Sequence, residues 1–407
     1  MKKIAATGLS RLALLLGAAL LLAACDNNNN DNNNKTGSIT VTTYNMGLAL
    51  NFVPYTAERL VANAELMAGS DSDVMCLQEV WLAEYVDTVE RALEENYPYI
   101  YSVPAEQRFS ASAACSSDEI AEFAACGDNE CGGLSGNALV ACASSSCGAS
   151  LAALSPACFD GVIGTVGIPD ITVDIMVDTV TQPTGLFAYD GALGLILASK
   201  YALQNREFQD FIDDSSSNHR GALYAEIEVN KQTHVVGCTH PTANLEGSIP
   251  YPESGKHGSW QGENRYMQEQ MIAFANRKAG DNPILFAGDF NCSIANAGNG
   301  VDADFAANCA LWLADGFADP AGDQLPCTFC EETNLILQPA GGSGSYVLDH
   351  IFVKNIESPD AIVAERVYDD PVSIEALVPP SELQPENSPT MTDPSDHYGV
   401  ELDIPLL

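Results

Sequence analysis

The chain has 407 residues, 46% of them hydrophobic, with 17 Lys and Arg against 55 Asp and Glu, a formal net charge of −38. This length allows one large domain or two ordinary ones, with ample apolar material for a core. Proteins that bind long nucleic acids gain most of their affinity by neutralising phosphates with basic residues. The net charge of this chain therefore argues against a broad nucleic-acid-binding surface. It leaves room for a small phosphoester bound through a metal ion.

The first 25 residues have the composition of an export signal. Three basic residues precede an apolar run at residues 12–22, which leads to Ala23-Ala24-Cys25. This pattern predicts a signal peptide at residues 1–24 and not a membrane-spanning helix. The run into Cys25 resembles a bacterial lipobox, so we expect a lipid-anchored, extracytoplasmic protein of the cell envelope; an ordinary signal peptide is the alternative. The Asn-rich composition of residues 25–37 predicts a flexible tether.

The chain after the tether alternates strand and helix patterns. Short apolar segments rich in β-branched or aromatic residues predict strands at 38–46, 73–80 and 97–103, and helices are predicted at 56–67 and 86–93. Glu79 lies near the end of the second strand. A carboxylate there is costly unless it is paired or bound to a cation, and an exposed strand end is the plain alternative.

Thirteen cysteines are present. If Cys25 carries lipid, twelve remain, and an even number in an exported protein predicts disulfides. Six of them, from Cys115 to Cys158, are spaced by 11, 5, 11, 5 and 11 residues and form three C-x10-C units. Eleven residues are close to three helical turns, so both cysteines of a unit would share one face of a helix. We expect a helical insert at about 104–190 joined by disulfides of open pairing, with a zinc cluster as the rival interpretation.

The second half of the chain predicts further strands. They lie at 191–201, in a hairpin at 220–229 and 235–240, at 283–291, at 346–353 and after residue 400, with a helix at 260–277. Residues 160–190 are less legible, and residues 370–390 predict a loop. A disulfide between Cys292 and Cys309 would fix the end of one strand. Cys327 and Cys330 form a C-x-x-C that we interpret as structural, because no thioredoxin-like pattern surrounds it.

One apolar strand ends in Gly288-Asp289-Phe290-Asn291. Asp289 and Asn291 are two residues apart, so on an extended chain both side chains point the same way. A carboxylate and an amide at a strand end can hold a water, a metal ion or a phosphate oxygen. The alternative is an Asx turn without a chemical role.

Several polar residues lie in or beside the predicted strand ends. The set is Asn45, Glu79, His240, Asp289, Asn291, Asp349, Asp396 and His397. Carboxylate and amide ligands favour Mg²⁺, with Mn²⁺ or Ca²⁺ as alternatives, over zinc. Histidines beside carboxylates can supply a general acid or base and its orienting partner. A metal ion, a histidine and a water-positioning carboxylate together indicate phosphoester hydrolysis.

The same residues carry a resemblance to a known family. Tyr-Asn-Met, Leu-Gln-Glu-Val, Thr-His, Gly-Asp-Phe-Asn, Leu-Asp-His-Ile-Phe and Ser-Asp-His-Tyr-Gly occur in the order typical of the endonuclease/exonuclease/phosphatase superfamily. The resemblance runs from about residue 38 to 405. It implies the DNase I-like fold, an α/β four-layered sandwich of two packed mixed β-sheets flanked by helices. Residues 38–407 would form this domain, with the Cys-rich helical insert inside it.

The resemblance implies metal-binding and positioning roles. Glu79 would be the main metal ligand, with Asn45 nearby. Asp396 would be a second metal ligand or lie close to the phosphate. Asp289 and Asn291 would position water and phosphate.

It also implies the acid–base residues. His397, oriented by Asp349, would act on the attacking water or the phosphate. His240 would stabilise the transition state or help to protonate the leaving group, the alternative being a satisfied strand histidine. Whether Asp289 or His397 is the base stays open. His350 would point to the opposite face of its strand.

Departures from the family's pattern leave the substrate open. Pro241 follows the Thr-His where Leu is frequent, Val80-Trp81 stands where secreted deoxyribonucleases have Arg, and the insert is large. The acidic composition and the lipobox favour a monomeric metal-dependent phosphodiesterase, anchored to the membrane through Cys25, that acts on a phospholipid head group in the manner of a sphingomyelinase. An extracytoplasmic nuclease is the alternative. A non-catalytic surface-binding lipoprotein on the same fold is the rival of a different class.

Overall fold

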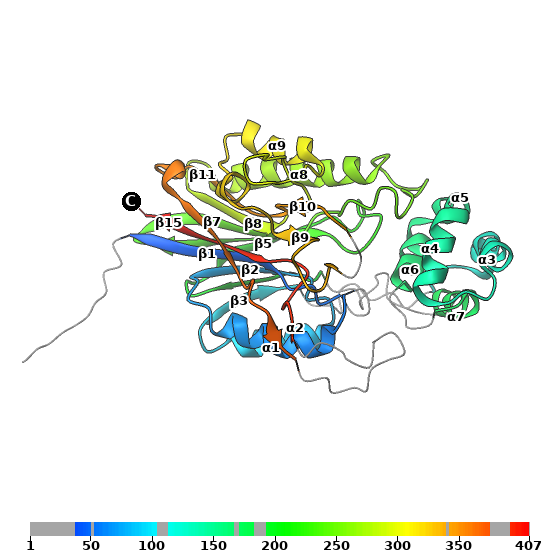
Figure 1. The fold of residues 1–407 in the computed structure, drawn as a ribbon. Coiled ribbons are helices and arrows are strands. Elements are labelled where there is room, and N and C mark those ends of the chain that lie inside the picture. Colours follow the sequence, from blue (N-terminus) through cyan, green and yellow to red (C-terminus); the bar gives the residue numbers. More distant parts are fainter. Residues whose placement is uncertain are drawn as a thin grey trace, which may run out of the picture. The chain divides into compact units, whose positions relative to one another are not determined.

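The computed structural model describes residues 37–49, 53–103, 113–166, 171–182, 193–338, 342–374 and 391–406. The predicted signal peptide and the tether up to residue 36 lie outside these residues. Two β-sheets pack face to face, and helices cover the outer face of each sheet (Figure 1). The predicted four-layered α/β sandwich is confirmed.

The first sheet contains both ends of the described domain. Its strands are β1 (Ser38–Asn45), β2 (Val74–Gln78), β3 (Tyr99–Ser102), β4 (Ile196–Ser199), β12 (Val363–Val367) and β15 (Gly399–Pro405). Their order is β12-β15-β1-β2-β4-β3, in which β1 and β2 are parallel and the other pairs antiparallel. The helices on its outer face are α1 (Thr56–Ala68) and α2 (Ala83–Leu93) (Figure 1).

The second sheet is built from the central and later parts of the chain. Its strands are β5 (Gln204–Asp210), β6 (Gly221–Val229), β7 (Gln232–Thr239), β8 (Ile284–Asp289) and β11 (Asp349–Lys354). Their order is β11-β8-β7-β6-β5, and only β7 and β8 run parallel among these described strands. The helices on its outer face are α8 (Trp260–Ala279) and α9 (Ala306–Ala314) (Figure 1).

Short elements complete the sandwich. They are α10 (Pro320–Gln324), the 3₁₀ turn η3 (Pro359–Ala361) and the strands β9 (Phe329–Cys330), β10 (Ser345–Tyr346), β13 (Val372–Ser373) and β14 (Met391–Thr392). In the described part of the chain, no helix is long and apolar enough to cross a membrane.

Central strands are apolar on both faces, because alternate side chains point to opposite sides of a sheet. In β2, Val74 and Cys76 face the second sheet, whereas Met75 and Leu77 pack under α1 and α2. In β8, Phe286 packs under α8 and α9. The apolar runs that predicted these strands are therefore the signature of two buried faces.

The sheets are also joined covalently. Cys76 of β2 and Cys238 of β7 form a disulfide between residues 162 positions apart. Cys76 lies three residues before Glu79, and Cys238 lies two residues before His240. The bond therefore holds together two strand ends that carry predicted site residues.

The insert is helical and contains three nested disulfides. Its helices are α3 (Ser117–Cys131), α4 (Gly136–Ser146), α5 (Gly148–Ala152), α6 (Pro156–Gly164) and α7 (Val173–Val180). The bonds are Cys115–Cys158, Cys126–Cys147 and Cys131–Cys142. The prediction of a disulfide-joined helical insert is confirmed, and these cysteines are bonded to each other and not arranged around zinc.

The expectation that each C-x10-C unit forms one helix is wrong. Helix α3 crosses from the first unit into the second, and Cys131 ends it. The next residues are Gly132 and Gly133, and Gly133 has φ +81°, a left-handed conformation that favours glycine and stops the helix. The eleven-residue spacing of the middle unit therefore closes a helix–turn–helix loop through Cys131–Cys142.

Other local predictions had mixed outcomes. The hairpin of β6 and β7 is confirmed, and its two turn residues, Asn230 and Lys231, both have positive φ. Residues 346–353 do not form one strand, because Val347 and Leu348 separate β10 from β11. The disulfides Cys292–Cys309 and Cys327–Cys330 are both present. Of the predicted loop at 370–390, residues 375–390 lie outside the described residues.

His350 lies on the outer face of its strand, as expected. Its Nδ1 is 3.0 Å from a carboxylate oxygen of Asp319, and its Nε2 is 3.0 Å from the backbone oxygen of Cys292. Burial lowers the pKa of His350, but Asp319 and the Cys292 carbonyl outweigh this effect and raise the pKa to about 9. The residue is thus a buried imidazolium paired with a carboxylate.

We expect the His350–Asp319 pair to make stability depend on pH. The folded pKa of about 9 lies above the ordinary 6.5, so the stabilisation is complete below pH 6.5 and is lost as the pH rises through 9. The loss should be about 3 to 4 kcal/mol. Asp319→Asn, which retains an acceptor for the N–H of Gly322, should remove most of this pH dependence in urea unfolding measured across this range. Equal pH dependence in both proteins would contradict the assignment.

The disulfide between the sheets should contribute strongly to stability. Replacing Cys76 and Cys238 by Ala should lower the free energy of unfolding by about 3 to 5 kcal/mol, because the bond closes a long loop in the unfolded chain. The matched control replaces Cys327 and Cys330, which are three positions apart, and should cost less. Urea unfolding of the three proteins measures the difference, and equal losses would refute this role.

Candidate active site

The predicted site residues from the first sheet lie side by side. Asn45 ends β1, and its partner in the parallel β1–β2 ladder is Gln78, which immediately precedes Glu79. Glu79 has φ +58°, so the chain turns sharply as it leaves β2. The Asn45 amide nitrogen donates to Glu79 Oε1 at 3.2 Å.

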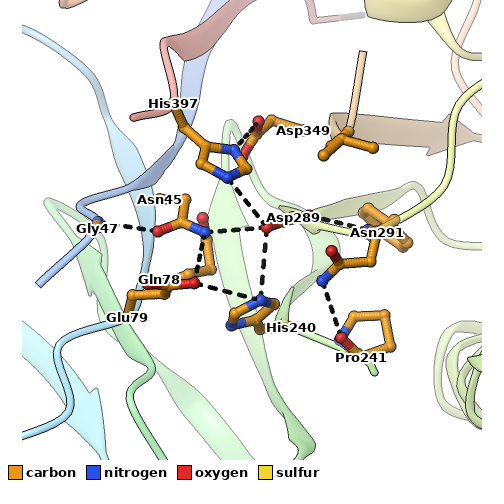
Figure 2. A network of polar contacts seen from close by, with 12 residues as sticks. Asn45, Gly47, Gln78, Glu79, His240, Pro241, Asp289, Asn291, Asp349 and His397 are labelled. Atoms are coloured by element: carbon orange, nitrogen blue, oxygen red, sulfur yellow. Dashed lines mark hydrogen bonds and ion pairs between the residues drawn. The ribbon is translucent and has the colours of Figure 1, made fainter. Parts of the chain in front are cut away.

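The second sheet places its predicted site residues beside those of the first sheet. In the parallel β7–β8 ladder Thr239 pairs with Gly288, so His240 and Asp289 follow at adjacent strand ends. Asp349 begins β11 directly opposite Asp289. Figure 2 shows these side chains pointing toward those of the first sheet.

Asn45 connects the two groups. Its amide nitrogen also donates to Asp289 Oδ2 at 2.9 Å, and its amide oxygen accepts from the backbone N–H of Gly47 at 3.0 Å (Figure 2). The side chain is fully buried, and all its polar atoms are used. Asn45 therefore fixes the carboxylates of both sheets relative to one another.

His397 forms a pair with Asp349. Its Nδ1 is 2.9 Å from Asp349 Oδ2, and its Nε2 is 3.9 Å from Asp289 Oδ2. Burial lowers the pKa of His397, but Asp349, then Asp289 and Asp396, raise it well above its usual value. This is the geometry of a histidine oriented by one carboxylate, with its other nitrogen directed into the site.

Asp289 lies at the centre of the network. Burial is the main cause that raises its pKa, with Asp349 adding to the effect and His397 and Asn45 opposing it, to about 7. A carboxylate with this pKa can exchange a proton near neutral pH.

The Asx turn at Asp289 is also present. Asp289 Oδ1 accepts the backbone N–H of Asn291 at 2.8 Å, and the Asn291 amide donates to the Pro241 backbone oxygen at 3.0 Å. Asn291 has φ +50°, so the extended chain assumed from the sequence was wrong. The turn and the site are thus compatible: one oxygen of Asp289 forms the turn and the other faces Asn45 and His240.

His240 lies close to the carboxylates of Asp289 and Glu79. Its Nε2 is 3.4 Å from Asp289 Oδ2 and 3.9 Å from Glu79 Oε1. Burial, followed by the positive charges of Arg220 and His397, lowers its pKa well below the usual value. Its Nδ1 has no hydrogen-bond partner within the described residues. His240 is thus a neutral imidazole with one ring nitrogen that has no hydrogen-bond partner among the described residues. It differs from the alternative interpretation, a strand histidine with both ring nitrogens hydrogen-bonded.

Glu79 and Asp396 form the acidic side of the site. Burial and then Asp396 raise the pKa of Glu79, while His397, Asn45 and Arg220 lower it. The carboxylate of Asp396 accepts from Ser395 Oγ at 3.1 Å, and a Cβ at position 47 would clash with it. Two neighbouring carboxylates and an amide are a donor set that suits a hard divalent cation, so the residues fit Mg²⁺.

A second group could also hold an ion. The ligand atoms of Asp289, Asp349 and His397 all lie within 4.8 Å of one another. The direct bond between His397 and Asp349 uses His397 Nδ1 and Asp349 Oδ2, whereas Asp349 Oδ1 has no hydrogen-bond partner among the described residues, so this group is a second candidate metal site beside Glu79 and Asp396. A further cluster of Cys292, Cys309 and His350 offers no thiolates, because its cysteines share a disulfide.

Sequence reasoning missed several residues that support the site. Arg59 of α1 is fully buried and donates to backbone oxygens of Met46, Gly47 and Pro394, which lie beside Asn45 and before Asp396. The apolar spacing of the helix gave no indication of this role. The buried Gln78 is the second such residue, and its Nε2 donates to Thr43 Oγ1 and to the Cys76 backbone oxygen.

A sandwich of this topology, with carboxylates and two histidines at its strand ends, defines a phosphoesterase fold of the DNase I-like class. The sequence profile of the Endonuclease/Exonuclease/phosphatase family matches residues 42–397. The chain therefore belongs to the Endonuclease/Exonuclease/phosphatase family. The comparison with curated protein sequences gave no match.

Solved structures share the fold at low sequence identity. Sphingomyelinase C from Streptomyces griseocarneus is 19% identical with a TM-score of 0.53, and the alignment covers 91% of this chain and 100% of that one. SmcL is 16% identical with a TM-score of 0.54, covering 90% and 99%. A Staphylococcus aureus beta toxin variant with bound magnesium ions is 15% identical with a TM-score of 0.51, covering 91% and 100%.

The pairing of His397 with Asp349 can be measured directly. Asp349→Asn should lower the pKa of His397 in the metal-free protein, because the neutral amide no longer stabilises the imidazolium. A histidine C–H titration by NMR reads this pKa. Asp214→Asn, which removes the carboxylate 3.2 Å from His257, is the control and should leave His397 unchanged. An unaltered His397 pKa in Asp349→Asn would refute the pairing.

Proposed function

We propose that this protein is a metal-dependent phosphodiesterase and that the network around Asp289 is its catalytic centre. The observation that carries the proposal is the continuous set of polar contacts from Glu79 through Asn45 and Asp289 to His397, with His240 contacting both carboxylates. These contacts join both sheets at one set of strand ends. Buried titratable groups arranged in this way are typical of a reaction centre.

Glu79, Asn45 and Asp396 would hold the metal ion, with Mg²⁺ the first choice. When bound, the ion would neutralise the charge of the phosphate and polarise it for attack by water. The unfavourable proximity of the Glu79 and Asp396 carboxylates supports this assignment, because a divalent cation would relieve it. The magnesium ions bound to the S. aureus beta toxin variant support the choice of metal.

The other residues would move and hold protons. The proton of the attacking water would pass to the Asp289–His397 pair, in which Asp349 keeps His397 correctly oriented. Asn291 would help to position the water and the phosphate. His240 is neutral at neutral pH and can donate a hydrogen bond to a developing negative charge on the phosphate or the leaving oxygen.

The substrate would be a phosphodiester with a lipid or another small alcohol, and not a long nucleic acid. The net charge of −38 disfavours a polyanion. The structural similarity to sphingomyelinase C supports a phospholipid head group as the first substrate to test. Six disulfides indicate an oxidising, extracytoplasmic compartment. Lipidation of Cys25 would place the enzyme beside such lipids.

A substrate panel tests the activity. Hydrolysis of sphingomyelin vesicles, plasmid DNA and a chromogenic phosphodiester is measured with Mg²⁺ and with EDTA. We expect Mg²⁺-dependent turnover of the lipid and the chromogenic substrate and its loss in EDTA. Metal-dependent cleavage of DNA alone would establish a nuclease instead, and no turnover of any substrate would contradict the proposal.

Variants locate the activity at the network. Glu79→Gln and His397→Gln should each lower kcat/KM by about 10² to 10⁴, through loss of the metal ligand and of proton transfer. Glu269→Gln, a change at an exposed carboxylate on α8, is the control and should keep full activity. Thermal unfolding checks that all three remain folded. Full activity in folded Glu79→Gln would refute the metal assignment.

A further inference from the structure

Arg220 is a buried cation with unsatisfied hydrogen-bond donors. It precedes β6, is 5% exposed, and its Nε and Nη1 atoms make no hydrogen bond to any described residue. No carboxylate of the described chain forms an ion pair with it. An unpaired guanidinium in a protein interior is costly, since its donors have lost their water without gaining acceptors.

The contrast with Arg59 shows that the situation is unusual. Arg59 is equally buried, but its Nε, Nη1 and Nη2 donate to four backbone oxygens at 2.6 to 3.1 Å. Arg59 is therefore a structural arginine with its donors used inside the protein. Arg220 has the same donor set, but its Nε and Nη1 find no acceptor among the described residues.

Arg220 lies beside the candidate active site. Its guanidinium carbon is 5.7 Å from the centre of a Trp81 ring, and the centroids of the Trp81 and His240 rings are 5.9 Å apart. Burial lowers the pKa of Arg220, while the nearby carboxylates oppose the shift; they are those of Glu79, Asp289, Glu263 and Asp160. In the β6–β7 ladder Ala222 pairs with Thr239, so the chain segments that carry Arg220 and His240 run next to each other.

Three of the acidic neighbours already have other donors, whereas Asp160 accepts from the Asn218 backbone N–H at 2.9 Å and its Oδ2 has no hydrogen-bond partner among the described residues. Glu263 accepts from the Ser216 backbone N–H, Thr242 Oγ1 and Tyr251 Oη at 2.7 to 3.0 Å. The Asn45 amide contacts the carboxylates of Asp289 and Glu79. These acids lower the cost of burying the Arg220 charge, but they leave its hydrogen-bonding face unused.

A guanidinium with unused N–H groups can donate charge-assisted hydrogen bonds to the oxygens of a phosphate. The nearby His240 Nδ1 is a second polar atom without a partner within the described residues. We propose that Arg220 binds the non-bridging oxygens of the substrate phosphate and is the anion-binding residue of the site. The inference rests on the proposed function for its substrate class, but the anion-binding property itself does not require turnover.

Binding of inorganic phosphate tests the proposal without catalysis. Phosphate is titrated calorimetrically into the Mg²⁺-saturated full chain. Arg220→Gln should weaken phosphate binding about 10- to 100-fold, as expected for a lost charge-assisted pair, and Arg220→Lys should retain part of the affinity. Arg265→Gln is the matched control, because Arg265 is exposed and pairs with Glu269 on α8, and it should bind phosphate normally.

Chemical rescue separates binding from a structural role. Added guanidinium ion should restore phosphate affinity to Arg220→Ala and should leave the wild type unchanged at the same concentration. Thermal unfolding shows whether each variant is folded. Normal phosphate affinity in a folded Arg220→Gln protein would overturn the proposal, as would a weak affinity in Arg220→Ala that guanidinium does not restore.

The outcomes distinguish this inference from the proposed function. If phosphate binding depends on Arg220 but the wild type hydrolyses no phosphodiester, the assigned activity fails while the anion site stands. If the wild type is active and Arg220→Gln keeps both its KM and its phosphate affinity, the activity stands and the role of Arg220 is refuted.

Discussion

The disulfide between Cys76 and Cys238 joins the two sheets directly behind the candidate site. Glu79 follows one cysteine by three residues and His240 follows the other by two, so the bond restricts the distance between two residues of the candidate site. Asn45 adds a non-covalent link at the same end of the sandwich, because its amide contacts a carboxylate from each sheet. The geometry of the site thus depends on holding two separate sheets in a fixed relative position. A preorganised reaction centre requires such a fixed geometry.

The second constraint is electrostatic. The site gathers four carboxylates, of which those of Asp289 and Asp349 are buried and those of Glu79 and Asp396 are half-buried. Burial raises the pKa of Glu79 and Asp289, which means that the folded protein holds these negative charges at a cost. A divalent cation beside Glu79 and the guanidinium of Arg220 would together offset these negative charges. Both positive groups would then bind the same substrate phosphate.

Much of the arrangement could be predicted from the sequence, because its strands are apolar on both faces and end in polar motifs. Asp289 and His397 belong to such motifs, and the structure brings them together. Strand β5 gave no such pattern, since it is an edge strand whose side chains are mostly exposed. The pairing of six cysteines in the insert depends on where Gly132 and Gly133 end a helix, which their even spacing does not reveal.

Arg220 was missed for a different physical reason. An arginine before a strand is ordinarily a solvated side chain, and only tertiary packing shows that this one is buried and that its Nε and Nη1 have no acceptor among the described residues. The same holds for Arg59, whose backbone partners come from three separate segments. Residues in recurrent strand-end motifs are visible in a sequence, whereas residues that act through burial are visible only in a structure.

The central claim is that Glu79 holds the metal ion of a phosphodiesterase centre. The most direct measurement is anomalous diffraction at the manganese edge from crystals of the protein grown with Mn²⁺. Our account predicts a peak about 2.1 to 2.3 Å from a Glu79 carboxylate oxygen, on the side of the site where Asp396 lies. A peak only between Asp289, Asp349 and His397, or no peak at these strand ends, would contradict it.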